Sequence, residues 1–295
     1  MKKFKPIIIV AGEPNGVFLE IFFKSLRIKF KSPIILIASK KLLKLQMNKL
    51  NYKKKIKLLE YKNLKKYKLD NKSINLINVD YNFSKPFEKI SDKYNCYIKK
   101  CFDLFFKIIK SKISNKLING PISKKTFLKK NFLGITEYIA SEFSTKKKAM
   151  LIFNKNLSVC PITTHLPLKF VSKEINKPVI EEKIKLIHKF YVRTFKLYPK
   201  IGVLGLNPHC ESIDKYNEDE KVIRPVITKL KKNGYKVSGP YPADTMFLNN
   251  NRKKFDVVIG MYHDQVLAPI KTLYEYDAFN ITLGLPFFRI SPDHG

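Results

Sequence analysis

The sequence predicts an α/β protein, in which helices pack against a largely parallel sheet. Short apolar runs alternate with lysine-studded amphipathic segments along all 295 residues, and this alternation is typical of βαβ units. Hydrophobic residues make up 44% of the chain, a share typical of globular proteins with a buried core. A chain of this length is expected to form two α/β lobes, with a border near residue 145.

Apolar runs along the chain are predicted to be the strands. They cover residues 6–11, 33–38, 116–118, 149–153, 158–163, 200–206, 235–238, 256–261 and 278–282. The first run follows lysines, as the apolar part of a signal peptide does, but it is short and leads into a turn with glycine and proline. We therefore interpret it as a strand. No apolar run approaches the ~18 residues that span a bilayer.

Amphipathic segments are predicted to be helices. Residues 177–197 carry apolar side chains at three- and four-residue spacing, and Pro178 suits a first helical turn. Residues 218–232 open with acidic side chains and end before Asn233-Gly234, a common helix stop. Residues 94–113 form another such segment within 40–115, where the overall pattern is weakest.

The net charge of +34 raises the question of nucleic-acid binding. However, arginine, the residue that forks onto phosphates and reads bases, is scarce. The 58 basic residues include only Arg27, Arg193, Arg224, Arg252 and Arg289 as arginines. The lysines are spread along the whole chain, so we expect solvated basic faces that favour anionic small molecules. A basic polyanion-binding protein on a decayed enzyme fold is the alternative of a different class.

The four cysteines contain no C-x-x-C pair. This indicates reduced thiols, and we expect a cytoplasmic protein.

Three of the five histidines occupy the same kind of position, just after a predicted strand. "SVCPITTH" ends in His165, "IGVLGLNPH" in His209 and "VVIGMYH" in His263. Ligands of an open parallel sheet bind beyond the carboxyl ends of its strands, so imidazoles there can converge on one point. Three protein ligands and an open position are typical of a catalytic divalent metal. The alternative is three unrelated loop histidines.

Other side chains near these strand ends are candidates for the same site. Asp264 follows His263 directly, and Asp244 lies in "GPYPADTMF"; either is suited to orient a metal-bound imidazole. The alternative for Asp244 is the N-cap of a helix that begins at Thr245. Cys210, next to His209, is either a fourth ligand or, as is more usual, a small buried thiol.

Residues near the C-terminal end of the sequence are candidates for binding an anionic group. Lys271 lies eight residues past His263, and "NITLGLPFFR" supplies Asn280 and Arg289. The arginine suits a phosphate or a carboxylate, and the alternative is an ordinary surface arginine. The eleven glycines contain no G-x-G-x-x-G, and "GEPNG" lacks the Lys-Ser/Thr of a P-loop. A standard dinucleotide or P-loop fingerprint is therefore excluded.

Eight stretches together resemble the 4-hydroxythreonine-4-phosphate dehydrogenase family of pyridoxal 5′-phosphate biosynthesis. They are "AGEPNG" (11–16), "NGPISK" (119–124), "GITEY" (134–138), "TTHLPL" (163–168), "GLNPH" (205–209), "GPYPADTMF" (239–247), "MYHDQ" (261–265) and "NITLGLPFFRISPDHG" (280–295). They run in the family's order from end to end, with residues 40–115 matching least. Any one stretch is weak, but the combination is highly specific.

The resemblance implies a two-lobed α/β/α fold like that of isocitrate and isopropylmalate dehydrogenases, with the active site in the cleft of a homodimer. Residues 1–145 with 276–295 are assigned to the first lobe and 146–275 to the second. The resemblance further implies that the three histidines bind Zn²⁺, Mg²⁺ or Co²⁺, with one of them donated by the partner subunit. The implied substrate-binding residues are Thr136, Lys271, Asn280 and Arg289.

The implied reaction is the oxidation of 4-phosphohydroxy-L-threonine by NAD or NADP. A metal at the substrate hydroxyl stabilises the developing alkoxide while hydride leaves, and the β-keto acid product loses CO₂ to give 3-amino-2-oxopropyl phosphate. Lys271, Asp244 and a metal-bound water are alternative general bases. Ile135 stands where the family has a histidine, and isoleucine cannot donate a hydrogen bond to a phosphate. A related dehydrogenase of phosphothreonate or phosphoerythronate is therefore the alternative within the same fold.

Overall fold

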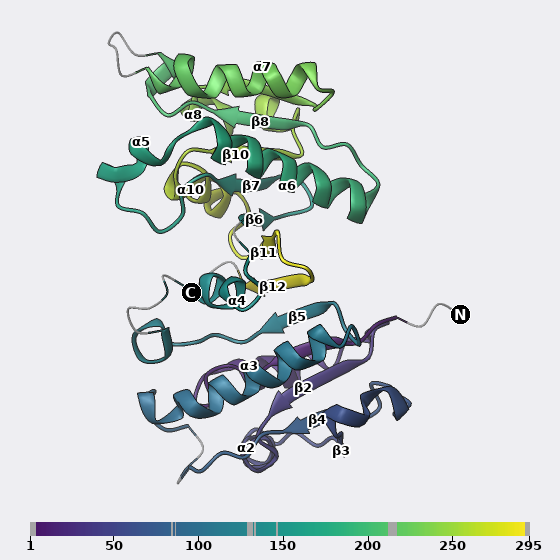
Figure 1. The fold of residues 1–295 in the computed structure, drawn as a ribbon. Helices are drawn as coiled ribbons and strands as arrows, with labels where there is room; N and C mark the ends of the chain where they lie inside the picture. The colour runs from purple at the N-terminus through teal and green to yellow at the C-terminus, as the bar shows by residue number, and fades with distance from the viewer. Residues whose placement is uncertain are drawn as a thin grey trace. The chain divides into compact units, whose positions relative to one another are not determined.

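The computed structural model describes residues 4–83, 85, 87–128, 132, 134–145, 147–211 and 217–292. The chain forms two compact units (Figure 1). Unit 1 contains the residues up to Ser144 together with Pro286–Ser291, and unit 2 contains Thr145–Leu285. The sequence predicted that the chain returns to the first lobe at residue 276. Residues 276–285 instead belong to unit 2, because β11 (Phe279–Leu283) pairs antiparallel with β6 (Ala149–Phe153) there.

The sheet of unit 1 is parallel and has the strand order β3-β4-β2-β1-β5-β12. Its strands are β1 (Ile7–Val10), β2 (Ile34–Ala38), β3 (Ile56–Leu58), β4 (Ile74–Asn78), β5 (Lys116–Asn119) and β12 (Phe288–Pro292). The sequence predicted β1, β2 and β5 but not the other three. In β4 the reason is Asn75, a buried polar residue whose Nδ2 donates to the carbonyls of Ile34 and Asp70 and interrupts the apolar pattern.

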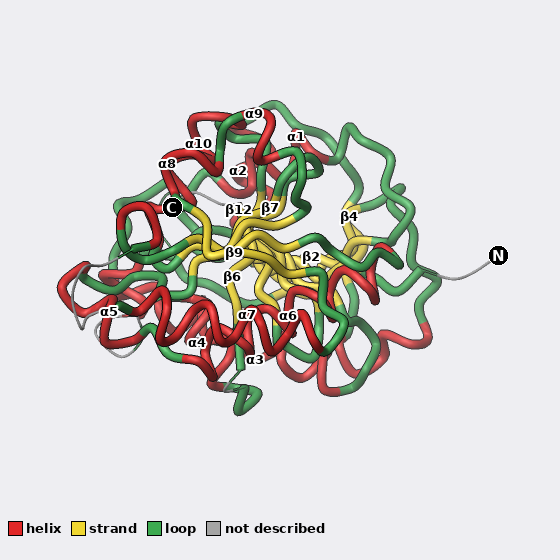
Figure 2. The backbone as a smooth tube through the Cα atoms, turned by 90° about the horizontal axis from the view of Figure 1, so that it is seen from above, coloured by secondary structure: helices red, strands yellow, loops and turns green. Residues whose placement is uncertain are grey.

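Helices cover both faces of the unit 1 sheet. They are α1 (Phe18–Ser25), α2 (Lys40–Lys49), α3 (Asn95–Lys110) and α4 (Ile135–Ser141). In Figure 2, α1 and α2 lie on one side of the strands and α3 on the other. Apolar side chains of α1 and α2, such as Phe22 and Leu43, pack with Ile9 and Leu36 of the strands into one buried cluster. Burying side chains of this size stabilises the unit by about 1.5–3 kcal/mol each.

The sheet of unit 2 has the order β11-β6-β7-β10-β8-β9. Besides β6 and β11, its strands are β7 (Ser158–Pro161), β8 (Ile201–Leu204), β9 (Val237–Tyr241) and β10 (Val257–Gly260). The strands from β7 to β9 pair in parallel, whereas β6 pairs antiparallel with both β7 and β11. The sequence predicted each of these strands to within a few residues. β7, β8 and β10 are buried along their whole length, the pattern of strands covered on both faces.

The helices of unit 2 also cover both faces of its sheet. They are α5 (Val171–Glu174), α6 (Lys177–Phe195), α7 (Arg224–Lys232), α8 (Ala243–Met246), α9 (Asn249–Arg252) and α10 (His263–Tyr274). Figure 2 places α6 and α7 on one side of the strands and α8 to α10 on the other. As predicted, α6 begins at residue 177; the Asn176 side chain caps it by accepting from the Val179 N–H, and it ends at the left-handed Lys196. Among the described residues, no helix has the length and apolar character needed to cross a bilayer.

Candidate active site

The strands that precede the three candidate histidines are neighbours in unit 2. β10 lies between β7 and β8 and pairs in parallel with both, with Val258 opposite Val159 and Ile259 opposite Val203. Their carboxyl ends therefore lie at one edge of the sheet. His165 and His209 lie in the loops that follow β7 and β8, and His263 is the first residue of α10 after β10. The expectation that the three histidines follow strands at the same sheet edge is confirmed.

Two of these imidazoles lie side by side. The ring centroids of His165 and His263 are 5.9 Å apart. Nδ1 of His263 is 2.6 Å from Oδ1 of Asp264, so the carboxylate contacts one ring nitrogen and leaves Nε2 for a ligand. An imidazole held by a carboxylate in this way is typical of metal sites.

His209 is exposed in the tight turn Pro208–Cys210 after β8, where its backbone is left-handed with φ 56°. Among the described residues of one chain, no group of three His, Cys, Asp or Glu side chains could hold a metal ion. One chain thus brings two of the three predicted ligands together. The donor chemistry of His165 and His263 fits a divalent cation as part of a site that needs a further ligand.

Cys210 does not fit the hypothesis of a fourth metal ligand, and Asp244 does not fit the hypothesis of a helix N-cap. Cys210 is buried, and burial together with the charge of Asp219 raises the pKa of its thiol to about 11. These properties favour the small buried thiol. Asp244 is exposed and is the second residue of α8, which begins at Ala243. The predicted helix start at Thr245 is wrong, and Asp244 is not its N-cap.

Arg289 is the most deeply buried charged side chain among the predicted site residues, with 1% of its surface exposed. Its Nε donates to Oδ1 of Asn119 and its Nη1 to Oγ1 of Thr136, each at 2.9 Å. Burial lowers the pKa of the guanidinium to about 10, an effect that the charge of Glu137 opposes, so it remains a cation at neutral pH. The alternative of an ordinary surface arginine is wrong. The structure brings Arg289 and Thr136 together in unit 1 and adds Asn119, which was predicted only as part of a matching stretch.

In unit 1, the loop that contains "AGEPNG" and the loop that contains "NGPISK" are in close backbone contact. The Glu13 N–H donates to the Pro121 carbonyl at 2.9 Å, and the Gly120 N–H to the Val10 carbonyl at 2.8 Å. A Cβ on Gly120 would lie 2.2 Å from the Ala11 carbonyl oxygen. The contact therefore requires glycine, which explains the glycine in "NGPISK" without a role in ligand binding.

The remaining predicted substrate residues belong to unit 2. Lys271 lies on α10, half-buried, with its Nζ 5.7 Å from the centroid of the Tyr276 ring. Asn280 lies on β11, and its buried Oδ1 finds no hydrogen-bond partner among the described residues. A buried amide oxygen without a partner is costly, so this atom is suited to accept a hydrogen bond from a bound ligand.

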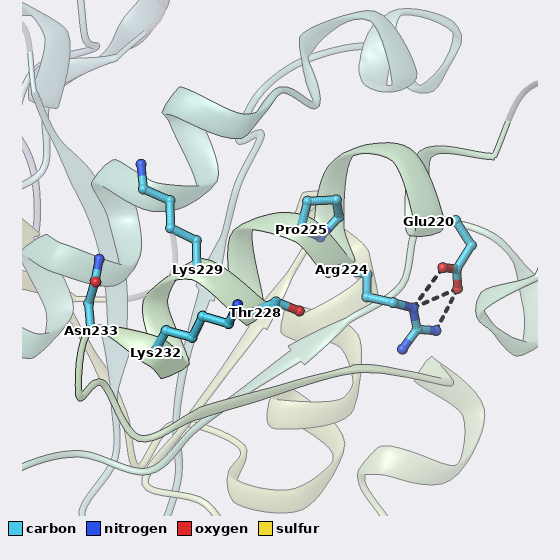
Figure 3. A pocket seen from close by; sticks show the side chains of 7 residues that line it. All are labelled: Glu220, Arg224, Pro225, Thr228, Lys229, Lys232 and Asn233. Atoms are coloured by element: carbon cyan, nitrogen blue, oxygen red, sulfur yellow. Dashed lines mark hydrogen bonds and ion pairs between the residues drawn. The ribbon is translucent and has the colours of Figure 1, made fainter.

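A hollow of about 520 Å³ on the surface of α7 does not coincide with these residues. Figure 3 shows that its walls are side chains of one helical segment, with Arg224 paired to Glu220 and Lys229 nearby. Arg224 and Glu220 are each about half exposed, at 49% and 46% of their side chains. We attribute this hollow to the solvated basic face that the sequence predicts.

Comparison with known proteins decides the family. The sequence model of the family described as "Pyridoxal phosphate biosynthetic protein PdxA" matches residues 29–295. The chain belongs to the PdxA family. The resemblance noted in the sequence is confirmed, and so is the α/β fold class.

Relatives with the name 4-hydroxythreonine-4-phosphate dehydrogenase align along nearly the whole chain. The protein from Sulfurihydrogenibium sp. is 36% identical over 98% of this chain and 89% of its own length. The protein from Aquifex aeolicus is 36% identical, with 99% and 90% covered. The crystal structure of 4-hydroxythreonine-4-phosphate dehydrogenase from Klebsiella pneumoniae superposes with a TM-score of 0.82 at 28% identity, covering 99% of this chain and 91% of that chain. This PdxA chain is therefore an oxidoreductase.

Proposed function

We propose that this PdxA chain oxidises 4-phosphohydroxy-L-threonine with NAD or NADP and one divalent metal per active site. The observation that carries the proposal is the pair of imidazoles, His165 and His263, at adjacent parallel strand ends, with Asp264 held against one of them. The family assignment supplies the substrate class, since the relatives are named for this phosphorylated hydroxy amino acid. We place the enzyme in the cytoplasm, where such metabolites and nicotinamide cofactors are available.

Anion recognition is assigned to Thr136, Lys271, Asn280 and Arg289. Arg289 supports this role because a guanidinium buried among Asn119 and Thr136 keeps its charge in a low-dielectric setting, where attraction to a phosphate or carboxylate is strong. Lys271 contributes a second cation, and Asn280 an acceptor for the substrate amino group or hydroxyl. Held at both ends, the substrate keeps its reacting C–H bond in one orientation.

The metal is assigned to His165, His209 and His263, gathered from two copies of the chain. When bound, Zn²⁺, Mg²⁺ or Co²⁺ would supply positive charge beside the reacting hydroxyl, which favours loss of its proton. Asp264 orients the His263 ring for this purpose. The same proposal implies a homodimer, because the described residues of one chain bring His165 and His263 together without a third ligand.

The reaction balances as a two-electron oxidation followed by decarboxylation. The hydroxyl proton passes to a base, for which Lys271 and Asp244 are the candidates, and the hydrogen on the same carbon leaves as hydride to the nicotinamide ring. The product ketone is β to the carboxylate. The bond to the carboxylate then breaks, CO₂ leaves, and its electron pair moves toward the ketone before protonation yields 3-amino-2-oxopropyl phosphate.

A substrate assay tests the proposal. Purified protein is given 4-phosphohydroxy-L-threonine, NAD⁺ or NADP⁺ and Zn²⁺, Mg²⁺ or Co²⁺, and the absorbance of the reduced cofactor is followed. We expect metal-dependent reduction with this substrate. Absence of reduction by every combination would contradict the proposal.

A second candidate is a dehydrogenase of phosphothreonate or phosphoerythronate. It is favoured by Ile135, the first residue of α4 beside Thr136, where a hydrogen-bond donor is missing. The same assay with these two substrates separates the candidates. Faster turnover of either sugar-acid phosphate than of 4-phosphohydroxy-L-threonine would establish the second one.

A further inference from the structure

A continuous set of buried hydrogen bonds joins the three loops that carry the candidate metal ligands. It runs through side chains of Thr163, Gln265 and Asp219, which expose 8%, 9% and 0% of their surface. Each connects backbone groups a few residues before a histidine. The three side chains come from different parts of the unit 2 sequence. The connected set of hydrogen bonds is therefore a property of the fold and not of one local motif.

Thr163 joins the loops after β7 and β10. Its Oγ1 and its N–H both donate to the Met261 carbonyl, at 2.8 and 3.1 Å. Thr163 precedes His165 by two residues, and Met261 precedes His263 by two. The two hydrogen bonds between Thr163 and Met261 therefore set the spacing between the two adjacent imidazoles.

Gln265 joins the loops after β10 and β8. Its Oε1 accepts from the Met261 N–H at 2.6 Å, and its Nε2 donates to the Gly205 carbonyl at 2.8 Å. The first bond resembles a capping box, since Gln265 is the third residue of α10 and reaches back to the backbone before the helix. The second bond crosses to the loop of His209. Each end of the amide thus makes a hydrogen bond to the backbone.

Asp219 holds the loop of His209. Its Oδ1 accepts from the Leu206 N–H at 2.7 Å, and its Oδ2 accepts from the N–H and the Nδ2 of Asn207, at 3.1 and 2.9 Å. A Cβ on Gly205 would lie 2.7 Å from this carboxylate, so the loop packs directly on it. The carboxylate thereby supports the left-handed backbone of His209 and Cys210 that follows.

We propose that Gln265 and Asp219 are positioning residues for the divalent metal. Gln265 fixes the backbone next to His263, and Asp219 fixes the loop of His209, which the chain presents to the second site of the dimer. The inference rests on the proposed function, because it concerns the same cation. A metal site tolerates displacements of only about 0.5 Å in its ligands, and loops after strands hold such positions only when their backbone is tied. Loss of either side chain should therefore weaken metal binding more than it weakens folding.

The experiment uses Co²⁺ as the probe and the chain's only two glutamines as a matched pair. Gln46 is also fully buried, but it lies in unit 1, where its Nε2 donates to the Pro14 carbonyl. Metal-free wild type, Gln265→Met, Asp219→Asn and the control Gln46→Met are titrated with Co²⁺. The visible Co²⁺ spectrum and the Kd are recorded, and thermal unfolding of each metal-free protein reports on folding alone.

We expect Gln265→Met and Asp219→Asn to bind Co²⁺ about 10–100-fold more weakly, with an altered spectrum, and Gln46→Met to bind as the wild type does. Gln265→Glu, which keeps the acceptor for the Met261 N–H, should recover part of the affinity and gives the readout if Gln265→Met does not fold. Wild-type Kd and spectrum in Gln265→Met and Asp219→Asn would overturn the inference and leave the proposed function standing. A wild type that binds no Co²⁺ would overturn both.

Discussion

Arg289 shows how a single residue links burial to recognition. Its guanidinium lies almost wholly inside unit 1, bonded to Asn119 and Thr136. Moving a charge out of water costs several kcal/mol unless partners compensate. The lowered pKa of the Arg289 guanidinium reflects this cost. A bound phosphate or carboxylate would supply the compensation, which is why we assign this residue to the substrate.

The first prediction concerns the shape of this cation. Arg289→Lys keeps a positive charge but loses the fork that reaches Asn119 and Thr136 at once. We expect kcat/KM to fall by about 10–100-fold, mainly through KM, because a charge-assisted hydrogen bond is worth about 1.5–3 kcal/mol. Steady-state kinetics of the wild type and the variant measure kcat and KM. The same exchange at Arg252 on α9, which donates to the Phe247 carbonyl, should leave kcat/KM unchanged. Equal effects at both positions would refute the role of Arg289.

The second prediction concerns the contact between Asp264 and His263. Asp264→Ala removes the carboxylate 2.6 Å from Nδ1 and frees the ring to rotate. We expect metal affinity to fall by about 10–100-fold, measured by competition with a chromogenic chelator. Asp103→Ala, which breaks the exposed pair with Lys99, is the control. Unchanged affinity in Asp264→Ala would mean that the contact is incidental.

At the scale of the elements, local patterns were enough to predict some features and not others. The positions of His165, His209 and His263 at strand ends could be predicted because each histidine follows an apolar strand. The burial of Arg289 could not, because it depends on Asn119 and Thr136, which are 170 and 153 residues away in the chain. Partners this distant leave no trace in the spacing of neighbouring residues.

The predicted helix over 218–232 illustrates a partial success at the same scale. Its second part is α7, but residues Asp219–Ile223 form a π-helical turn whose first residue is the buried Asp219. The predicted helix start near Glu218 is confirmed, and Asp219 in addition holds the loop of His209. The order of the three neighbouring strands β7, β10 and β8 was likewise outside the reach of the sequence pattern.

The third prediction concerns the loop after β1, where both carboxylate oxygens of Glu13 are buried without a well-formed hydrogen bond from the described residues. Burial raises the pKa of Glu13 above 4.5, and the nearby backbone N–H of Asn15 only partly offsets it. The folded state therefore binds this proton more tightly than the unfolded chain. The resulting stabilisation is present below the ordinary pKa and is lost as pH rises through the raised pKa.

Accordingly, we expect Glu13→Gln to raise the melting temperature at neutral pH, with a gain that shrinks as the pH is lowered toward 4.5. Thermal unfolding across this pH range measures it. Glu20→Gln on α1, which breaks an exposed pair with Lys24, should give no such gain. A Glu13→Gln variant that is less stable than the wild type at neutral pH would show that the carboxylate is satisfied in solution.

At the scale of the whole molecule, we propose that the site is shared between two copies of the chain. His165 and His263 lie together in one copy, so the fourth prediction is that His209 comes from the other. His165→Ala, His209→Ala and His263→Ala should each be inactive. A heterodimer of His209→Ala with either other variant regenerates one intact site of two, and half of the dimers in a fully exchanged equal mixture are heterodimers, so such mixtures should recover about a quarter of the wild-type activity. The mixture of His165→Ala with His263→Ala should stay inactive, and failure of all mixtures would place all ligands in one chain.

The most direct test of the central claim is the metal content of the purified protein and of its three histidine variants, measured by elemental analysis after dialysis. The account predicts one divalent cation per chain in the wild type, because each active site of the dimer holds one. His165→Ala, His209→Ala and His263→Ala should each lose it, whereas His188→Ala on α6, a half-buried histidine beside Tyr235, should keep it. Wild-type metal content in all three site variants would contradict the claim.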